Sequence, residues 1–578
     1  MEFEQKAEEK KMSMSKNIAR LAVTAGLTAA LSFGGVMAPV TMAFAAGTDG
    51  SVTIENVEGN DTEFKGYQIF KADVDNGKVT NIAWVDDNVK AAVEVVIRTE
   101  DPDYAGKTAQ DAADWITKEV TGTNETFRVG PDDIAYKIAD AVDSLTATTQ
   151  TVNRSANNLK HGYWLFVTDA STIGTGEAGT SPIFTVVGST HVQITEKTGV
   201  PTVEKKIVSD KDGKEYDAAD SQIGQNVTYN LYGTVAENYD KYKTYFYEFS
   251  DQISEGLTLQ NGAQVYLYES KDAAQKDLKH EKPTLNITDS FTPRSGDADA
   301  NGNKTMTWTC NNLKDISGAT ITKDSCIVVS YTAQINKHAV VGLNSNQEGN
   351  PNTVTLHYSN SPMTSNNPMT EEYGQTVSDT VRDYTYGLKI NKVDLGTEKP
   401  LEGARFTIKT KGDENTNDKY VNADGMLSDS EVILSTDANG AITLTGLDAG
   451  TYTVTEKHLD GYADISPFDF TIVPTMSEDG TKIEKLTLSM PETGKLIAGI
   501  NDDGEGKVGD NQLEAKADTS TNPDGTFNIT VGNTKQIGLP LTGLNGVTFT
   551  WIAGGAVLCI GVAHLIRSRK QAEESEQE

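Results

Sequence analysis

Short segments in which apolar and polar residues alternate recur along most of this 578-residue chain, and they constrain its fold more than any other feature. The clearest of them cover 51–57, 226–232, 264–268, 325–333 and 353–358. A period of two places the apolar side chains of a strand on one face, and turn-forming residues separate one strand from the next. Helical spacing over 109–120 and 134–145 interrupts the pattern near its start. The sequence therefore predicts a mainly β protein of tandem sandwiches, the first with helical insertions.

The composition excludes several classes of function. The 50 Lys and Arg against 83 Asp and Glu give a formal charge of −33, whereas nucleic-acid binding needs clustered basic residues. Three cysteines and seven histidines leave little material for a disulfide scaffold or a zinc site. No nucleotide-binding, zinc-protease or Ser-His-Asp pattern is present. We therefore expect no nucleic-acid partner, no cofactor, no metal and no turnover of an external substrate.

The N-terminus has the features of an export signal. Basic residues precede an apolar run over 21–38, and Ala43-Phe44-Ala45 follows as a small-x-small cleavage site. We expect cleavage after Ala45, so that residues 1–45 are a signal peptide and the protein is secreted. An uncleaved transmembrane anchor is the alternative.

The C-terminal segment 536–578 carries three features in a fixed order. The pentapeptide Leu539-Pro540-Leu541-Thr542-Gly543 is followed by an apolar stretch over 544–566 and a basic tail. The stretch is long enough to span a bilayer, and basic residues hold such an end in the cytoplasm. This order resembles the cell-wall sorting signal of Gram-positive surface proteins. The resemblance implies that a sortase attacks the Thr542 carbonyl and releases the chain from Gly543 onward; an ordinary membrane anchor is the alternative.

The segment 384–535 contains three further patterns that resemble those of a known protein family. Residues 388–394 with 400–406 resemble the opening of a CnaB-type domain. Residues 450–462 resemble the E-box of pilins, and 529–533 resemble the last strand of such a domain. In that family, a lysine on the first strand bonds to an asparagine on the last, assisted by the E-box glutamate.

The resemblance assigns these roles to three residues. It implies an intramolecular isopeptide bond between Lys392 and Asn533, with Glu456 as the catalytic group. Burial favours the neutral, nucleophilic form of a lysine and the protonated form of a carboxyl group. Such a carboxyl can polarise an amide and carry protons as ammonia leaves. A buried lysine–glutamate pair or a solvated strand face is the alternative.

The segment 198–383 offers a similar set. Period-two alternation places Lys205 on the apolar face of its strand. The surroundings of Asn352 resemble a final strand, and those of Asp251 resemble the catalytic segment of CnaA-like domains. The resemblance implies a Lys205–Asn352 bond assisted by Asp251, with Lys206 as the internal alternative to Lys205.

A polymer of such subunits also needs an acceptor lysine on another copy. In major pilins this lysine lies on or just after the last strand of the N-terminal domain, often within Tyr-Pro-Lys-Asn, a motif that is absent here. Lys197 is the first candidate for the acceptor and Lys160 is the second. The alternative is that Lys197 is a solvated surface residue and not an acceptor. The N-terminal segment 46–197 has no lysine on its opening strand, and we expect no intramolecular bond there.

Two cysteines lie in neighbouring predicted strands of a protein that we expect to be exported. A disulfide between Cys310 and Cys326 and two free buried thiols are both compatible with this placement.

The chain is identified as a member of the sortase-assembled major (backbone) pilins of Gram-positive bacteria, of the SpaA type. The resemblance implies immunoglobulin-like CnaA/CnaB-type sandwiches over 46–197, 198–383 and 384–535. It also implies a pilus shaft subunit, joined head to tail through Thr542 and the acceptor lysine and anchored to peptidoglycan at the cell surface. The implied partners are further copies of the chain, a pilin-specific and a housekeeping sortase, minor pilins and host surface receptors. A single-copy anchored adhesin or minor pilin is the alternative.

Overall fold

The computed structural model describes most of the chain between Asp49 and Gln536. The described residues are 49–55, 58–75, 78–121, 132–145, 149–152, 154–196, 198–260, 262–342, 349–363, 373–412, 417–490, 496–500, 507–508, 512–516 and 527–536. Their sheets form three pairs that follow one another along the chain, here called the first, second and third unit. The architecture is mainly β, as the alternating pattern predicts.

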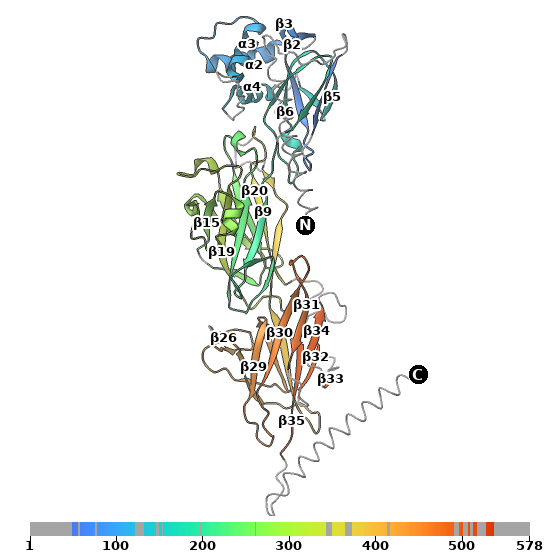
Figure 1. Cartoon of the computed structure of the whole chain (residues 1–578), viewed down its shortest axis with the longest axis vertical. Coiled ribbons are helices and arrows are strands. Elements are labelled where there is room, and N and C mark those ends of the chain that lie inside the picture. Colours follow the sequence, from blue (N-terminus) through green and yellow to red (C-terminus); the bar gives the residue numbers. More distant parts are fainter. Residues whose placement is uncertain are drawn as a thin grey trace, which may run out of the picture.

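The first unit has a small sheet in the order β5-β1-β8 and a larger one in the order β3-β2-β6-β7, with β4 paired to β2. Its elements are β1 (Gly50–Glu55), β2 (Phe64–Asp75), β3 (Lys78–Trp84), α2 (Asp87–Glu100), α3 (Ala109–Thr121), α4 (Ile134–Asp143), β4 (Thr149–Val152), β5 (Ser155–Leu159), β6 (Gly162–Thr168), β7 (Ile183–Val187) and β8 (His191–Thr195). The small sheet packs on one face of the larger sheet, and the helices pack on the other (Figure 1). β6 is buried along its whole length for that reason, which explains its unbroken apolar run.

Helix α2 is a long element that the sequence pattern does not predict. Its buried side chains, Val89, Val93 and Ile97, are β-branched, and such residues favour strands locally. They nevertheless lie four residues apart, on one face of a helix, and pack with α4 in the core of this unit. Asp86 caps the first turn by accepting a hydrogen bond from the Val89 N–H at 2.9 Å. Tertiary packing thus overrides the local strand preference.

The second unit is a sandwich of two larger sheets. One has the order β10-β9-β12-β19-β15-β16, with β14 paired to β19; the other has the order β11-β22-β20-β13-β18-β17, with β21 paired to β20. The elements are β9 (Val203–Val208), β10 (Glu215–Tyr216), β11 (Ala218–Asp220), β12 (Asn226–Thr234), β13 (Tyr247–Ile253), β14 (Leu257–Leu259), β15 (Gln264–Tyr268), α5 (Lys271–Gln275), β16 (Leu285–Asn286), β17 (Thr292–Ala298), β18 (Lys304–Cys310), β19 (Cys326–Ile335), β20 (Asn350–Tyr358), β21 (Gly374–Gln375) and β22 (Asp379–Tyr384). A single apolar core rich in Val, Ile and Tyr fills the space between these sheets.

The third unit pairs its first strand with its last. Its sheets have the orders β28-β23-β35-β32-β33 and β26-β25-β24-β29-β30-β31-β34, with β27 paired to β24. The strands are β23 (Tyr386–Asp394), β24 (Arg405–Thr410), β25 (Tyr420–Val421), β26 (Leu427–Ser428), β27 (Leu434–Ser435), β28 (Ala441–Leu447), β29 (Gly450–Glu456), β30 (Phe468–Met476), β31 (Ile483–Ser489), β32 (Leu496–Ile500), β33 (Lys507–Val508), β34 (Gln512–Lys516) and β35 (Phe527–Asn533). β23 and β35 are parallel, with Lys392 opposite Val531 and Asp394 opposite Asn533. The two ends of the unit are therefore neighbours in one sheet.

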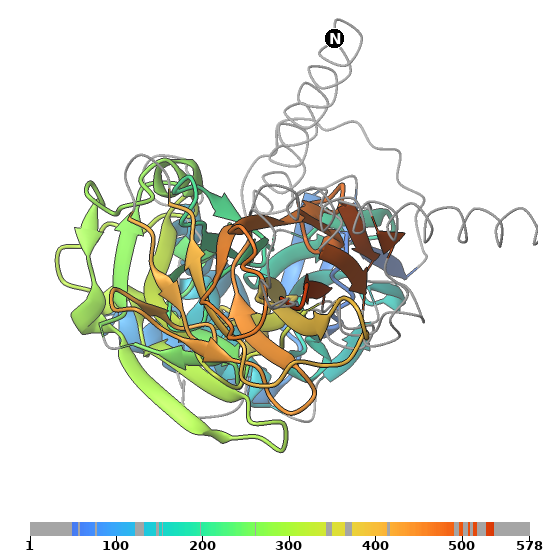
Figure 2. The same cartoon turned by 90° about the horizontal axis from the view of Figure 1, so that it is seen from below.

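The units lie one after another along the long axis of the molecule (Figure 1). Seen from below along that axis, the orange strands of the third unit lie in front of the units that precede it (Figure 2). Hydrogen bonds cross both junctions: the Gly179 N–H donates to the Asn360 carbonyl at 2.6 Å, and the Ile223 N–H donates to the Gly446 carbonyl at 3.0 Å. Only Thr385 separates β22 from β23, so the second junction has very little free chain.

A buried acid lies in the second unit close to this junction. Asp383 on β22 is fully buried, and its Oδ2 accepts hydrogen bonds from Ser221 Oγ at 3.0 Å and from Tyr229 Oη at 3.4 Å. Burial raises the pKa of Asp383 to about 8, although these two hydrogen bonds oppose the change. The nearby Asp220 carboxylate raises the pKa further in the same direction. Asp383 therefore favours its protonated form when the chain is folded.

We expect Asp383→Asn to change how the stability of the chain depends on pH. The folded pKa of about 8 exceeds the value of about 4 of an unfolded aspartate, so only the unfolded state loses the proton between these values. The free energy of unfolding of the natural chain should then fall, relative to the variant, by about 1.4 kcal/mol per pH unit between about pH 4 and about pH 8. Calorimetric unfolding at both ends of this range measures the difference. A difference that does not change with pH would contradict the assignment.

Candidate cross-linking sites

Lys205, Asp251 and Asn352 meet in the core between the two sheets of the second unit. Lys205 comes from β9 in one sheet, whereas Asp251 and Asn352 come from the paired strands β13 and β20 of the other. All three residues are fully buried. Lys205 Nζ donates a short hydrogen bond to Asp251 Oδ1. The fold thus brings together a lysine, an acid and an amide that are far apart in the sequence.

Tyr331 on β19 completes this site, and sequence reasoning missed it. Its hydroxyl donates to Asp251 Oδ2 at 2.5 Å and accepts from Lys205 Nζ at 3.1 Å and from Asn352 Nδ2 at 2.6 Å. A signal was available, because alternation along 325–333 places this tyrosine on the inward face, where a hydroxyl needs a polar partner.

The Lys205 amine lies among aromatic rings. Nζ is 5.5 Å from the centre of the Tyr229 ring and 5.4 Å from that of Tyr331, and Trp308 stacks on Tyr331. Burial lowers the pKa of Lys205 to about 8, although the Asp251 carboxylate opposes the change. The neutral amine, which is the nucleophilic form, is therefore accessible near neutral pH.

Lys206 points away from this core. Its Nζ is 2.6 Å from Asp217 Oδ1 and 2.9 Å from Glu204 Oε1, and its side chain is 19% exposed. Partial burial lowers the pKa of Lys206, but the hydrogen bonds to Asp217 and Glu204 outweigh this and leave it raised. The geometry places Lys205, and not Lys206, at the acid and the amide.

Lys392, Glu456 and Asn533 meet in the third unit. Lys392 and Asn533 lie on the parallel neighbours β23 and β35, and Glu456 ends β29 in the facing sheet. Lys392 Nζ is 3.3 Å from Glu456 Oε1, and Asn533 Nδ2 donates to Glu456 Oε2 at 2.8 Å. The side chains of Lys392 and Glu456 are 0% and 2% exposed. A single carboxylate therefore contacts both the amine and the amide.

Both asparagines are held through the amide nitrogen. Nδ2 of Asn352 donates to a tyrosine hydroxyl and Nδ2 of Asn533 to a carboxylate, while neither Oδ1 has a hydrogen-bond partner among the described residues. The atom that would leave as ammonia in an amide exchange thus contacts a group that can exchange protons, the Tyr331 hydroxyl or the Glu456 carboxyl group.

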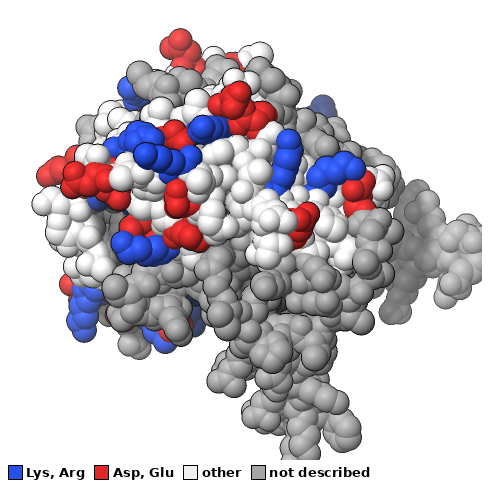
Figure 3. Space-filling view, turned by 90° about the horizontal axis from the view of Figure 1, so that it is seen from above, with Lys and Arg blue, Asp and Glu red and all other residues white. Residues whose placement is uncertain are grey.

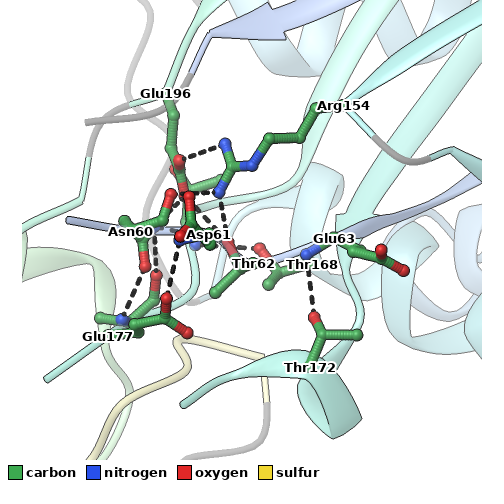
Figure 4. A network of polar contacts seen from close by, with 11 residues as sticks. Asn60, Asp61, Thr62, Glu63, Arg154, Thr168, Thr172, Glu177 and Glu196 are labelled. Atoms are coloured by element: carbon green, nitrogen blue, oxygen red, sulfur yellow. Dashed lines mark hydrogen bonds and ion pairs between the residues drawn. The ribbon is translucent and has the colours of Figure 1, made fainter. Parts of the chain in front are cut away.

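The first unit has an acid and an amide in contact, but with an arginine instead of a lysine (Figure 4). Glu196, next after β8, accepts from Asn60 Nδ2 at 2.6 Å and forms an ion pair with Arg154 Nη1 at 3.0 Å. Arg154 Nη2 also donates to the Asn60 carbonyl at 2.6 Å. A guanidinium group stays protonated and is no nucleophile. The expectation that this unit forms no isopeptide bond stays a prediction, and this network gives a physical reason for it.

Several predicted sites lie outside the described residues. They are the signal peptide, the acceptor candidate Lys197, the sorting motif from Leu539 to Gly543 and the apolar stretch that follows it. The second acceptor candidate, Lys160, is described: its side chain is 70% exposed, and its Nζ is 2.7 Å from Asp49 Oδ2.

Cys310 and Cys326 are free and buried, so the disulfide alternative is wrong. β18 with Cys310 and β19 with Cys326 follow each other in the sequence but belong to opposite sheets, because the connection between them crosses the sandwich. Burial raises the pKa of Cys310 to about 11 and that of Cys326 to about 12, which keeps both thiols protonated at neutral pH.

Two further features concern the part of the chain that the structure covers. Within it, no group of His, Cys, Asp and Glu residues is arranged to hold a metal ion, and no helix is long and apolar enough to cross a membrane. On the face seen from above, acidic and basic side chains are interspersed (Figure 3).

We expect Arg154→Ala to destabilise the first unit strongly. The substitution leaves the buried Glu196 carboxylate without its cation, which costs about 3–5 kcal/mol for a buried pair. Lys160→Ala is the matched control, because it removes an exposed ion pair and should change the free energy of unfolding by less than about 1 kcal/mol. Urea unfolding of both variants measures the effect. Equal midpoints would show that the network does not stabilise this unit.

Comparison with known proteins connects these sites to a family. Residues 387–487 match the family described as the SpaA prealbumin-like fold domain. Over 280 residues, the chain is 25% identical to the trypsin-resistant surface T6 protein of Streptococcus pyogenes serotype M6, a match that covers 46% of this chain and 44% of that protein. The chain thus spans less than half the length of this relative.

Two solved structures align with most of this chain. The T6 backbone pilin of serotype M6 Streptococcus pyogenes matches 85% of this chain and 100% of its own, at 16% identity and a TM-score of 0.49. The Corynebacterium diphtheriae major pilin SpaA matches 84% and 100%, at 12% identity and a TM-score of 0.43. The segment that holds Lys392 and Glu456 thus matches the SpaA prealbumin-like fold domain, in a chain that is similar over part of its length to a streptococcal surface protein.

Proposed function

We propose that this chain is the shaft subunit of a covalent, sortase-assembled surface pilus. The observation that carries the proposal is the pair of buried lysine–carboxylate–asparagine sets, one in the second unit and one in the third. Homology to the surface T6 protein and the match of the third unit to the SpaA domain support it. The order of pentapeptide, apolar stretch and basic tail at the C-terminus supports attachment to the cell wall.

Each buried set is proposed to form one isopeptide bond, Lys205 to Asn352 and Lys392 to Asn533. The lysine amine attacks the asparagine amide carbon, so that a bond from Nζ to Cγ forms and the bond from Cγ to Nδ2 breaks. A proton from the lysine reaches Nδ2 by way of the carboxyl group, Asp251 or Glu456, and ammonia leaves. The fold holds the reacting groups together and needs no external catalyst.

The polymer is proposed to grow through the two ends of the subunit. A pilin-specific sortase would cleave after Thr542 and join its carbonyl to the acceptor, Lys197, of the next copy. A housekeeping sortase would then attach the base of the fibre to peptidoglycan. Minor pilins and host surface receptors are the further partners of such a fibre.

The two bonds would set the path of tension through each subunit. A pull that enters at Lys197 soon reaches Lys205, crosses to Asn352, continues through β22 and β23, crosses from Lys392 to Asn533 and leaves at Thr542. The bonded residues are 147 positions apart (205 to 352) and 141 positions apart (392 to 533). Tension would therefore bypass nearly all residues of both sandwiches. The first unit, which precedes Lys197, would lie outside the path and would need no covalent bond.

One observation favours the alternative of a single-copy anchored adhesin or minor pilin. The Tyr-Pro-Lys-Asn motif that often carries the acceptor lysine in major pilins is absent from this sequence.

A denaturing gel of cell-wall material tests the proposal. Wall fragments of the native bacterium are boiled in SDS and probed for this chain, and we expect a ladder of high-mass bands because covalent bonds between subunits survive boiling. Lys197→Ala should collapse the ladder to one band near the monomer, whereas Lys160→Ala should leave it intact. A single band from the natural chain would contradict the pilin and favour the adhesin.

A further inference from the structure

Among the described residues, the Tyr331 hydroxyl is the one group that contacts every member of the cross-linking site in the second unit. It donates to the Asp251 carboxylate and accepts from the Lys205 amine and the Asn352 amide, at 2.5, 3.1 and 2.6 Å. Tyr331 is 2% exposed, and its ring is fixed between Tyr229 and Trp308, whose ring centres are 5.4 and 5.3 Å away. The hydroxyl is therefore held in place and has no bulk water beside it.

We propose that Tyr331 is a second catalytic residue of the Lys205–Asn352 reaction, which passes a proton to the amide nitrogen that leaves as ammonia. This inference rests on the proposed function, because it presupposes that the isopeptide bond forms. It assigns to Tyr331 a chemical role, beyond packing and beyond the contribution of Asp251.

The third unit shows why the second needs this residue. There the Glu456 carboxylate contacts Lys392 with one oxygen and Asn533 with the other, so it can move a proton between them directly. In the second unit the acid is an aspartate, one methylene shorter. Among the described residues, Asp251 has a hydrogen bond to the lysine but none to Asn352, and the tyrosine hydroxyl spans that gap.

The proposed reaction conserves protons and charge. Lys205 first gives one proton to Asp251 Oδ1, and its neutral amine attacks Cγ of Asn352 to give a tetrahedral intermediate with a positive Nζ and a negative oxygen. Tyr331 then gives its proton to Nδ2 and takes one from the Asp251 carboxyl group, and the carboxylate that this leaves on Asp251 takes the second proton from Nζ. The negative oxygen re-forms the carbonyl, the bond from Cγ to Nδ2 breaks, and ammonia leaves. The products are a neutral amide, a neutral Asp251 and an unchanged Tyr331.

The surroundings of Tyr331 favour its role as a proton donor. Burial and, after it, the Asp251 carboxylate hold the pKa of Tyr331 well above its ordinary value. The hydroxyl therefore keeps its proton until the amide nitrogen needs it, and Asp251 restores the proton at once through the hydrogen bond between them.

Tyr331→Phe tests the inference, with Tyr229→Phe as its matched control. Tyr229 lies directly opposite Tyr331 on the neighbouring strand β12 and stacks on it, but its hydroxyl points to Asp383. Full chains are sampled at intervals after a pulse of synthesis, and digestion with mass spectrometry gives the fraction of Lys205 joined to Asn352 with loss of one ammonia. We expect Tyr331→Phe to slow this reaction by about 100-fold or more, and Tyr229→Phe to leave its rate unchanged. The Lys392–Asn533 bond is the internal control and should form at the same rate in every chain.

Two further measurements separate chemistry from stability. In a Lys205→Ala background, where no bond can form, the two Tyr→Phe variants should unfold at similar temperatures. A fluorinated tyrosine at position 331, which keeps the ring and the hydroxyl but has a lower phenol pKa, should restore the bond and shift the pH profile of its formation.

The outcomes are distinct. Bond formation in Tyr331→Phe at the natural rate, or a fluorotyrosine profile identical to that of the natural chain, overturns the catalytic role while the isopeptide bond stands. Absence of the bond in the natural chain overturns the proposed function and this inference with it.

Discussion

The burial of a lysine ammonium beside a carboxylate and an asparagine amide is the interaction on which the rest of this molecule depends. Moving both charges out of water costs several kcal/mol per ion, and their attraction offsets this cost only in part. A fold that keeps such a set in its core is destabilised by it until the charges are removed. In the proposed reaction, the lysine and the acid both end neutral, so the bond removes the cost that the unreacted site imposes. The sandwich must fold first, because the second site draws on both sheets and the third on strands at opposite ends of the unit.

The two sites differ in how the acid reaches the lysine and the asparagine. In the third unit, the longer Glu456 reaches both partners, and the joined strands already lie side by side in one sheet. In the second unit, the bond would join one sheet to the other, and Asp251 needs Tyr331 to reach the amide. The first unit has Arg154 in place of a lysine and would stand outside the path of tension. The short connection from β22 to β23 would pass tension directly from one bonded unit to the next.

The sequence predicted the parts of this account that depend on local pattern. Alternation predicted the strands of the second unit and the inward side of Lys205, and motif resemblance singled out Asp251 and Asn352, which lie on paired strands of the facing sheet. What depends on tertiary structure could be predicted at most in part. The β-branched face of α2 reads locally as a strand, the connection from Cys310 to Cys326 crosses the sandwich, and Tyr331 belongs to no motif. Only the paired sheets show that its hydroxyl lies between the acid and the amide.

Single-molecule force spectroscopy tests the central claim most directly. The full chain is held through a Lys197→Cys handle and through a second handle just after Gln536, and its extension is recorded as the force rises. The account predicts that neither sandwich lengthens, because tension runs through the two isopeptide bonds. In a double variant with Lys205→Ala and Lys392→Ala, both sandwiches should unfold and lengthen. Extension of the natural chain in steps of roughly 500 Å, the length of about 150 residues at roughly 3.4 Å each, would contradict it.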